Sequence, residues 1–197
     1  TAKLVANLLT EAGADRILTM DLHAGQIQGF FDIPVDDLTS RILFAKDIKR
    51  QFFKEDTNVM DAPTVFVSPD AGGTVRARRY ADMFGGDVDG QHAIIVDDII
   101  DSGGTLCNAA QAIMDAGALS VRAYITHGVL TGTACQKVEK SVLKELVITD
   151  SIEFKCPDTI HKIRVVGTAQ LFGEALRRVS NEESVSSLFT QKISNDK

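Results

Sequence analysis

Residues 93–105, AIIVDDIIDSGGT, set the class of fold that this chain can adopt. The aliphatic run from Ile94 to Val96 is typical of a strand buried on both faces of a parallel sheet, and we expect it to stop at the acids that follow. After a Gly103-Gly104 turn, Thr105 is expected to cap a helix, because apolar residues follow at helical spacing: Leu106, Ala109, Ala110 and Ile113. Such a turn presents backbone N–H groups at a helix N-terminus, which favours an anion.

Three aspartates beside this turn narrow the choice of ligand. Asp97, Asp98 and Asp101 would repel a bare phosphate, but carboxylates suit ribose hydroxyls or a metal ion. The loop therefore predicts a ligand with a phosphate at one end and a diol at the other. The plainer alternative is an ordinary strand-to-helix turn with surface aspartates, although a buried strand rarely ends in three acids. A P-loop is excluded because no Gly-Lys-Ser/Thr follows.

The composition bounds the class of protein. The chain has 197 residues, 44% of them hydrophobic, and a net charge of −6. The length suits one substantial domain or one domain with extra pieces. The sequence contains no dense basic stripe of the kind that would indicate a nucleic-acid surface. Its apolar runs are too short to cross a membrane. The three cysteines, Cys107, Cys135 and Cys156, have spacings unsuited to zinc, and we expect buried free thiols.

Strands and helices alternate along the chain. Apolar or β-branched segments predict strands at 17–20, 64–67, 94–96, 121–126, 146–149 and 163–166. Amphipathic patterns predict helices at 4–9, 38–53, 74–84, 105–113 and 171–179. This alternation indicates an α/β fold with a parallel sheet, in which ligands bind beyond the carboxyl ends of the strands.

Three further motifs carry the family resemblance. The acidic loop resembles the phosphoribosyl-diphosphate loop of type I phosphoribosyltransferases, and residues 21–36, DLHAGQIQGFFDIPVD, resemble the signature of the ribose-phosphate diphosphokinase family. Residues 68–78, SPDAGGTVRAR, match a third block of that family, and residues 126–132 match a fourth. By itself, His23 would more often be a structural histidine, and Asp70 a helix cap.

The resemblance implies a fold and an activity. The fold is a parallel-sheet, Rossmann-like phosphoribosyltransferase domain. The activity transfers the diphosphoryl group of ATP to the anomeric hydroxyl of ribose 5-phosphate, which gives 5-phospho-ribose 1-diphosphate and AMP for nucleotide biosynthesis. The family also implies a cytoplasmic enzyme that forms homo-oligomers built from dimers, commonly hexamers, with phosphate or ADP as effectors. No nucleic-acid or membrane partner is implied.

The resemblance also assigns roles to residues. The sugar phosphate would lie on the turn, with the ribose hydroxyls on the acid pair, so that the substrate-binding residues are Asp97, Asp98, Asp101, Ser102, Gly103, Gly104 and Thr105. Mg²⁺ would be held by His23 and Asp70, with Asp21 as a third candidate. Asp32 and Asp36 would order the signature loop, and His127 receives no catalytic role.

The expected division of the chain follows from the same resemblance. Residues 1–33 would be a remnant of an N-terminal phosphoribosyltransferase-like domain, of which the chain keeps only the last helix and strand. Residues 34–165 would form the C-terminal domain that binds the sugar phosphate. Residues 166–197 would form a helix and tail that pack back on the N-terminal part.

The sequence departs from the family in two places. Segments like Phe-Ser-Asp-Gly-Glu and Arg-Gln-Asp, which serve the adenine nucleotide, do not occur, and Phe84 runs into Gly85 where relatives carry a loop with a Lys-Arg-Arg cluster. Because that loop supplies the cations for catalysis, no catalytic residue is assigned, and we expect binding without turnover. Two alternatives stay open: a non-catalytic regulatory paralogue, and a phosphoribosyltransferase that uses the same loop.

Overall fold

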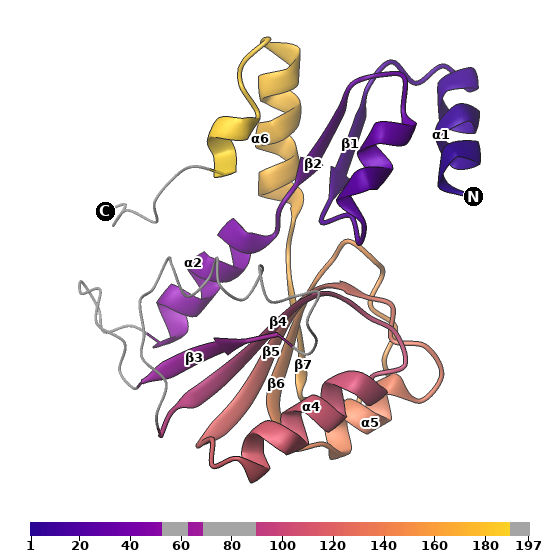
Figure 1. Ribbon diagram of the computed structural model, residues 1–197. Coiled ribbons are helices and arrows are strands. Elements are labelled where there is room, and N and C mark those ends of the chain that lie inside the picture. Colours follow the sequence, from indigo (N-terminus) through magenta and orange to yellow (C-terminus); the bar gives the residue numbers. More distant parts are fainter. Residues whose placement is uncertain (53–62, 69–89, 190–197) are drawn as a thin grey trace.

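A parallel β-sheet forms the centre of the computed structural model, which describes residues 1–52, 63–68 and 90–189 (Figure 1). The sheet has five strands in the order β3-β4-β5-β6-β7, and every neighbouring pair is parallel. The strands are β3 (Thr64–Val67), β4 (His92–Ile100), β5 (Ser120–Gly128), β6 (Leu143–Thr149) and β7 (Ile163–Val166). The predicted parallel α/β fold is confirmed.

Helices cover both faces of this sheet, which explains the continuous aliphatic run in β4. On one face, α4 (Gly104–Asp115) and α5 (Ala134–Lys140) pack against a core that includes Ile95 and Ile125. On the other face, α2 (Arg41–Phe52) packs against Ile94 and Val96. Successive side chains of β4 therefore enter opposite cores, as a strand buried on both sides requires.

A smaller sheet lies beside the main one. Strands β1 (Ile17–Met20) and β2 (Val35–Leu38) pair in parallel, with α1 (Ala2–Glu11) and the 3-10 helix η1 (Gly25–Phe30) next to them. The chain returns to this sheet at α6 (Ala169–Ser180) and the 3-10 helix η2 (Ser186–Phe189), as Figure 1 shows. A third core joins these segments; its buried members are Met20, Leu38, Leu171, Ala175, Val185 and Leu188.

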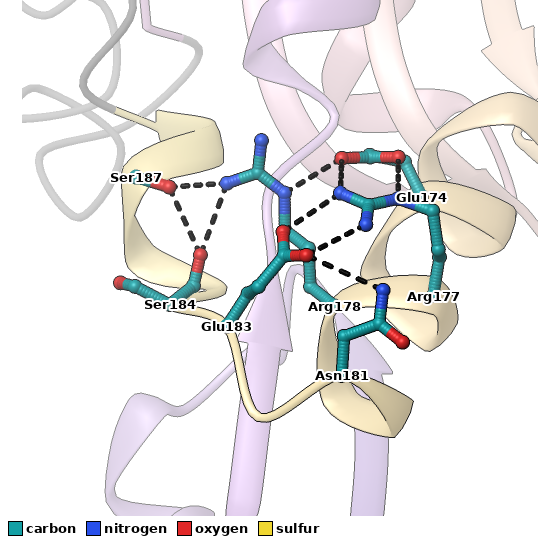
Figure 2. A network of polar contacts seen from close by, with 7 residues as sticks. All are labelled: Glu174, Arg177, Arg178, Asn181, Glu183, Ser184 and Ser187. Carbon is teal, nitrogen blue, oxygen red and sulfur yellow. Dashed lines mark hydrogen bonds and ion pairs between the residues drawn. The ribbon is translucent and has the colours of Figure 1, made fainter.

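A polar network fastens the end of α6 to η2. Figure 2 shows Arg177 between the carboxylates of Glu174 and Glu183, while Arg178 reaches Glu174 and the hydroxyl of Ser187. Because η2 contributes Leu188 to the third core, these contacts help to keep that core closed. The division of the chain at residue 33 stays a prediction, although the pairing of β1 with β2 places Val35–Leu38 beside the first segment.

Several expected boundaries are wrong. β4 does not stop at the acids but runs to Ile100, so that Asp97 and Asp98 lie inside the strand, near its carboxyl end. α4 begins at Gly104 with Gly103 as its N-cap, and Thr105 lies inside the helix. α2 begins at Arg41 rather than Leu38, because Val35–Leu38 pairs as a strand with β1. The expected helix at 74–84 lies outside the described residues.

The cysteines also differ from expectation. Cys135 and Cys156 form a disulfide, with their Cα atoms 6.0 Å apart, and Cys107 is free. That separation is within the range that a disulfide spans. The pairing could not be foreseen because it joins α5, a helix that the sequence pattern did not predict, to the loop between β6 and β7. Within the described ranges, no helix is both long enough and apolar enough to span a bilayer.

Candidate functional site

The acidic loop lies at the carboxyl end of β4, where it turns into α4. Gly103 has φ of 75°, a left-handed conformation that glycine adopts without strain. Its carbonyl accepts the first bond of the helix, from the N–H of Cys107, at 3.0 Å. No side chain in the described part of the protein caps this helix. The N–H groups of its first turn therefore point toward the loop, where a phosphate can bind them.

The acid pair differs in environment. The Asp97 carboxylate accepts a hydrogen bond from the N–H of Asp98 at 2.9 Å, which turns it back toward its own strand. The Asp98 side chain is only 5% exposed, and its Oδ2 lies 3.0 Å from Nδ1 of His23. These two residues are 75 positions apart in the sequence. The fold thus brings the signature motif directly onto the acidic loop.

The contact fixes how His23 can act. The imidazole ring is 77% exposed, and an ionised Asp98 can only accept a hydrogen bond, so Nδ1 carries the proton. In a neutral ring, Nε2 is then the nitrogen with a lone pair. A histidine that ligates a metal commonly donates its other N–H to a carboxylate in this way. The pair therefore fits the chemistry of a metal-ligating histidine.

Further contacts shape the turn itself. Asp101 accepts a hydrogen bond from the Thr131 hydroxyl at 2.6 Å, and its carbonyl accepts one from the N–H of Thr131. Lys137 of α5 donates to the carbonyl of Ser102 at 3.1 Å, which places a cation beside the turn. The sequence reasoning missed both residues. Thr131 lies in the fourth family block, but Lys137 lies in a helix whose short apolar pattern gave no signal.

The carboxylate of Asp21, the third metal candidate, makes hydrogen bonds within the protein. The residue's φ is 43°, and its Oδ2 accepts hydrogen bonds from the N–H of Ser40 at 3.0 Å and from the Thr126 hydroxyl at 2.7 Å. The carboxylate thus points toward β5 and the start of α2. Asp21 stays a predicted ligand, but its hydrogen bonds join the smaller sheet to the main one.

The remaining predicted residues are spread out. Asp32 pairs with Lys3 and Asp36 pairs with Arg16, so that each ties its loop or strand to a neighbouring segment. Asp70 and the junction of Phe84 with Gly85 lie outside the described residues. Among the residues that the structure describes, no three histidine, cysteine or acidic side chains cluster as a metal site would require. The metal site stays a prediction that rests on His23.

Known proteins match both the sequence and the fold. The family model described as "Phosphoribosyl synthetase-associated domain" matches residues 64–190. The ribose-phosphate pyrophosphokinases of Rhizobium meliloti (strain 1021) and Agrobacterium fabrum (strain C58) are each 53% identical over 96% of this chain. The chain spans about two thirds, 66%, of the length of each.

A solved structure has a similar fold. The phosphoribosylpyrophosphate synthetase of Mycobacterium smegmatis superposes with a TM-score of 0.82 and 34% identity, over 92% of this chain and 64% of that one. The family match covers more than half of the chain and includes the acidic loop, the strand that carries it and the helix that follows. The chain therefore belongs to the phosphoribosyl synthetase family, as its motifs predicted.

Proposed function

We propose that this chain carries the sugar-phosphate site of a ribose-phosphate diphosphokinase. The contact of His23 with Asp98 supports the proposal most directly, because it joins the two motifs that such a site needs. The turn that begins α4 would hold the 5-phosphate through its N–H groups and the hydroxyls of Ser102 and Thr105. Asp97 and Asp98 would accept hydrogen bonds from the ribose hydroxyls.

In the proposed reaction, the anomeric oxygen of ribose 5-phosphate forms a bond to the β-phosphorus of ATP. The bond from that phosphorus to the oxygen shared with the α-phosphorus breaks, AMP leaves with that oxygen, and the proton of the sugar hydroxyl passes to solvent. Such a transfer needs positioning and charge neutralisation more than covalent help from the protein. The contribution of this chain would be to fix the acceptor oxygen in place.

We propose magnesium as the ion at the same site. His23 and Asp70 would hold the ion, and the hydrogen bond from Nδ1 to Asp98 leaves Nε2 for that purpose. Once bound, the ion would neutralise charge on the transferred diphosphoryl group. We carry over from the family, also as proposals, binding of ATP, phosphate or ADP effectors, a homo-oligomer based on dimers and a cytoplasmic location.

Calorimetric titration of the 197-residue chain tests the proposal. Ribose 5-phosphate should bind, whereas ribose, which lacks the phosphate, should not. Thr105→Val removes an exposed hydroxyl expected to contact the phosphate, and it should weaken binding about tenfold or more, since a hydrogen bond to a charged group contributes ~1.5–3 kcal/mol. Asn108→Ala, exposed one turn further along α4, is the matched control and should leave the affinity unchanged.

Failure of ribose 5-phosphate to bind would overturn the proposal. A second assay, with magnesium, ATP and ribose 5-phosphate, should give no product, because the sequence lacks the Lys-Arg-Arg cluster. Normal turnover would contradict that part of the reasoning. Product from phosphoribosyl diphosphate and adenine, uracil or orotate would instead identify a phosphoribosyltransferase. Co-purification with an active subunit, without sugar-phosphate binding, would identify a regulatory paralogue.

A further inference from the structure

Two neighbouring residues at the end of β5 hold the segment that carries His23. Thr126 donates a hydrogen bond from its hydroxyl to Oδ2 of Asp21 at 2.7 Å. The ring of His127 lies with Nε2 at 3.0 Å from the carbonyl oxygen of Met20 and at 3.2 Å from that of Asp21. Since β5 belongs to the main sheet and Met20 ends β1, these contacts cross from one sheet to the other.

The partners of the His127 ring show which of its nitrogens donates a hydrogen bond. Both partners of Nε2 are carbonyl oxygens, which only accept, so Nε2 carries a proton and donates it. Nδ1 lies 2.9 Å from the hydroxyl of Ser151, which can donate to it. That hydroxyl is itself 2.9 Å from Oγ1 of Thr149, on the adjacent strand. The ring is thus held from both sides.

Thr126 is equally constrained. It is buried and lies 2.8 Å from the hydroxyl of Ser40, also buried. Because the Thr126 proton goes to the Asp21 carboxylate, the Ser40 hydroxyl must donate to Thr126. The N–H of Ser40 donates to the same carboxylate oxygen of Asp21 at 3.0 Å. The three groups close a small ring of hydrogen bonds around one carboxylate.

The held residue has an unusual backbone. Asp21 has φ of 43°, in the left-handed region, which is uncommon outside glycine and which aspartate adopts more readily than most other residues. It directly follows β1 and precedes Leu22 and His23. The N–H of Leu22 is also held, by the carboxylate of Asp37 at 3.3 Å. The segment that leads to His23 is therefore fixed by side chains and not by pairing with the main sheet.

We propose that Thr126 and His127 form a latch that positions His23 against Asp98. This inference rests on the proposed function, because it concerns the same site. Neither residue touches the sugar-phosphate turn, so they are positioning residues. Without the latch, the bend at Asp21 keeps its bonds within the smaller sheet and to the N–H of Ser40 but loses its contacts to β5, and we expect His23 to be held less firmly at its 3.0 Å contact with Asp98. With the latch, Nδ1 of His23 stays against Asp98, which leaves Nε2 for a metal ion.

Thr126→Val is the sharpest test, because it keeps the shape of the side chain and removes only the hydroxyl. Thr126→Ser restores the hydroxyl and is the matched control. The chain has only four histidines, so the ring nitrogens can be followed one by one in long-range ¹H–¹⁵N spectra at one fixed pH. In Thr126→Val, the His23 signals should move toward those of a free imidazole, and Thr126→Ser should return them. The His92 and His161 signals should not move.

A second readout concerns the metal ion. Mn²⁺ should broaden the His23 ring signals of the unaltered chain, and Thr126→Val should weaken this effect about tenfold in Mn²⁺ concentration, as loss of a supporting partner commonly does. Binding of ribose 5-phosphate should stay within twofold, since the turn before α4 is untouched. A variant that merely loosened the fold would weaken both ligands together.

The outcomes separate the two proposals. Unchanged His23 signals in a folded Thr126→Val chain would overturn the latch, and so would failure of Thr126→Ser to restore them. If Thr126→Val does not fold, Ser151→Ala serves instead, because Ser151 is exposed and its hydroxyl contacts Nδ1 of His127 and the carbonyl oxygen of Thr126 without touching Asp21 or His23. It too should shift the His23 signals. Absence of ribose 5-phosphate binding by the unaltered chain would overturn the proposed function, while the ring spectra would still decide the latch.

Discussion

Asp47→Asn is a direct test of how the main sheet holds α2. The Asp47 side chain is 4% exposed and lies at the centre of a polar network. Arg164 donates to both of its oxygens, at 3.1 and 2.7 Å, and the Tyr124 hydroxyl donates to Oδ2 at 3.0 Å. Arg50 and Gln51 of the same helix donate as well. The substitution keeps the volume and removes the charge.

The expected cost follows from these contacts. Breaking a fully buried ion pair by changing one partner costs ~3–5 kcal/mol. Here Arg164 is 32% exposed and keeps Glu145 as a second partner at 2.7 Å, so we expect a smaller loss, about 2–3 kcal/mol in the free energy of unfolding. Tyr124→Phe, the matched control, removes one hydrogen bond to the same carboxylate and should cost about 1 kcal/mol.

The pH dependence provides an independent check. Burial alone would raise the pKa of the Asp47 carboxyl, but the hydrogen bonds and charge of Arg164 outweigh it and lower the pKa below its ordinary value of 3.8. A lowered pKa in the folded state stabilises the fold fully above pH 3.8, and this stabilisation declines as the pH falls through the folded value. Asparagine does not titrate, so the difference between the two proteins should shrink in acid.

Urea unfolding at pH 7, 5, 4 and 3 measures both effects. A loss below about 1 kcal/mol at pH 7 would refute the assignment of a strong ion pair, since that is no more than one ordinary hydrogen bond. A deficit of Asp47→Asn that stays constant down to pH 3 would refute the linkage to the Asp47 carboxylate.

Three further predictions concern packing and the turn. Gly103→Ala, at φ 75°, should lower the free energy of unfolding in urea by about 1–2 kcal/mol and weaken the binding of ribose 5-phosphate in calorimetry. Gly104→Ala, whose φ is not positive, should lose less stability. Gly128→Ala would place a Cβ 2.6 Å from Cδ1 of Ile148 and should cost about 1–3 kcal/mol in urea unfolding; Ile148→Val, which lacks that atom, should restore part of the loss in the double variant. Cys135→Ser removes the disulfide to Cys156, 21 residues further along the chain, and should lower the free energy of unfolding by about 3 kcal/mol. The melting temperature of this variant should no longer depend on a reductant, whereas that of Cys107→Ser should still do so.

The main sheet was predictable because its strands are locally distinctive. Ile94 to Val96 has side chains that enter two cores, and an uninterrupted aliphatic run is the pattern that this produces. β2 has no such pattern: Asp36 and Asp37 are half of its residues, and one of them is held by Thr19 across the small sheet. Pairing with β1 stabilises the strand. A short window of the sequence cannot reveal this pairing, because the two strands are separate segments of the chain.

The candidate site divides in the same way. The turn at Gly103 could be predicted because a glycine pair before a helix is a local signal. The contact of His23 with Asp98 could only be suspected from the family resemblance, since it joins motifs in different sheets. Thr126 lies in the fourth family block, but nothing local indicated its contact, because a threonine in a β-strand is common and its partner, Asp21, lies 105 positions away. The disulfide, which depends on α5, was missed for a similar reason.

One face of β5 connects these observations. The side chains of Arg122, Tyr124 and Thr126 point the same way, because residues two apart on a strand share a face. Each reaches the α2 segment: the Arg122 guanidinium lies over the Phe52 ring at 4.6 Å, Tyr124 bonds Asp47, and Thr126 lies against Ser40. The helix is thus held at its end, its middle and its start by a single strand.

This arrangement sets the position of the smaller sheet, since α2 is the direct continuation of β2. A helix held at one point could slide or pivot, whereas contacts at both ends and in the middle fix its register along β5. β2 in turn pairs with β1, which ends one residue before Asp21. Asp47→Asn weakens only the middle contact, so it should lower stability while Thr126 still holds Asp21 and the His23 signals stay in place. Thr126→Val acts in the opposite way, at the end nearest the site. The two variants should therefore separate stability from positioning, although both act on the same strand face.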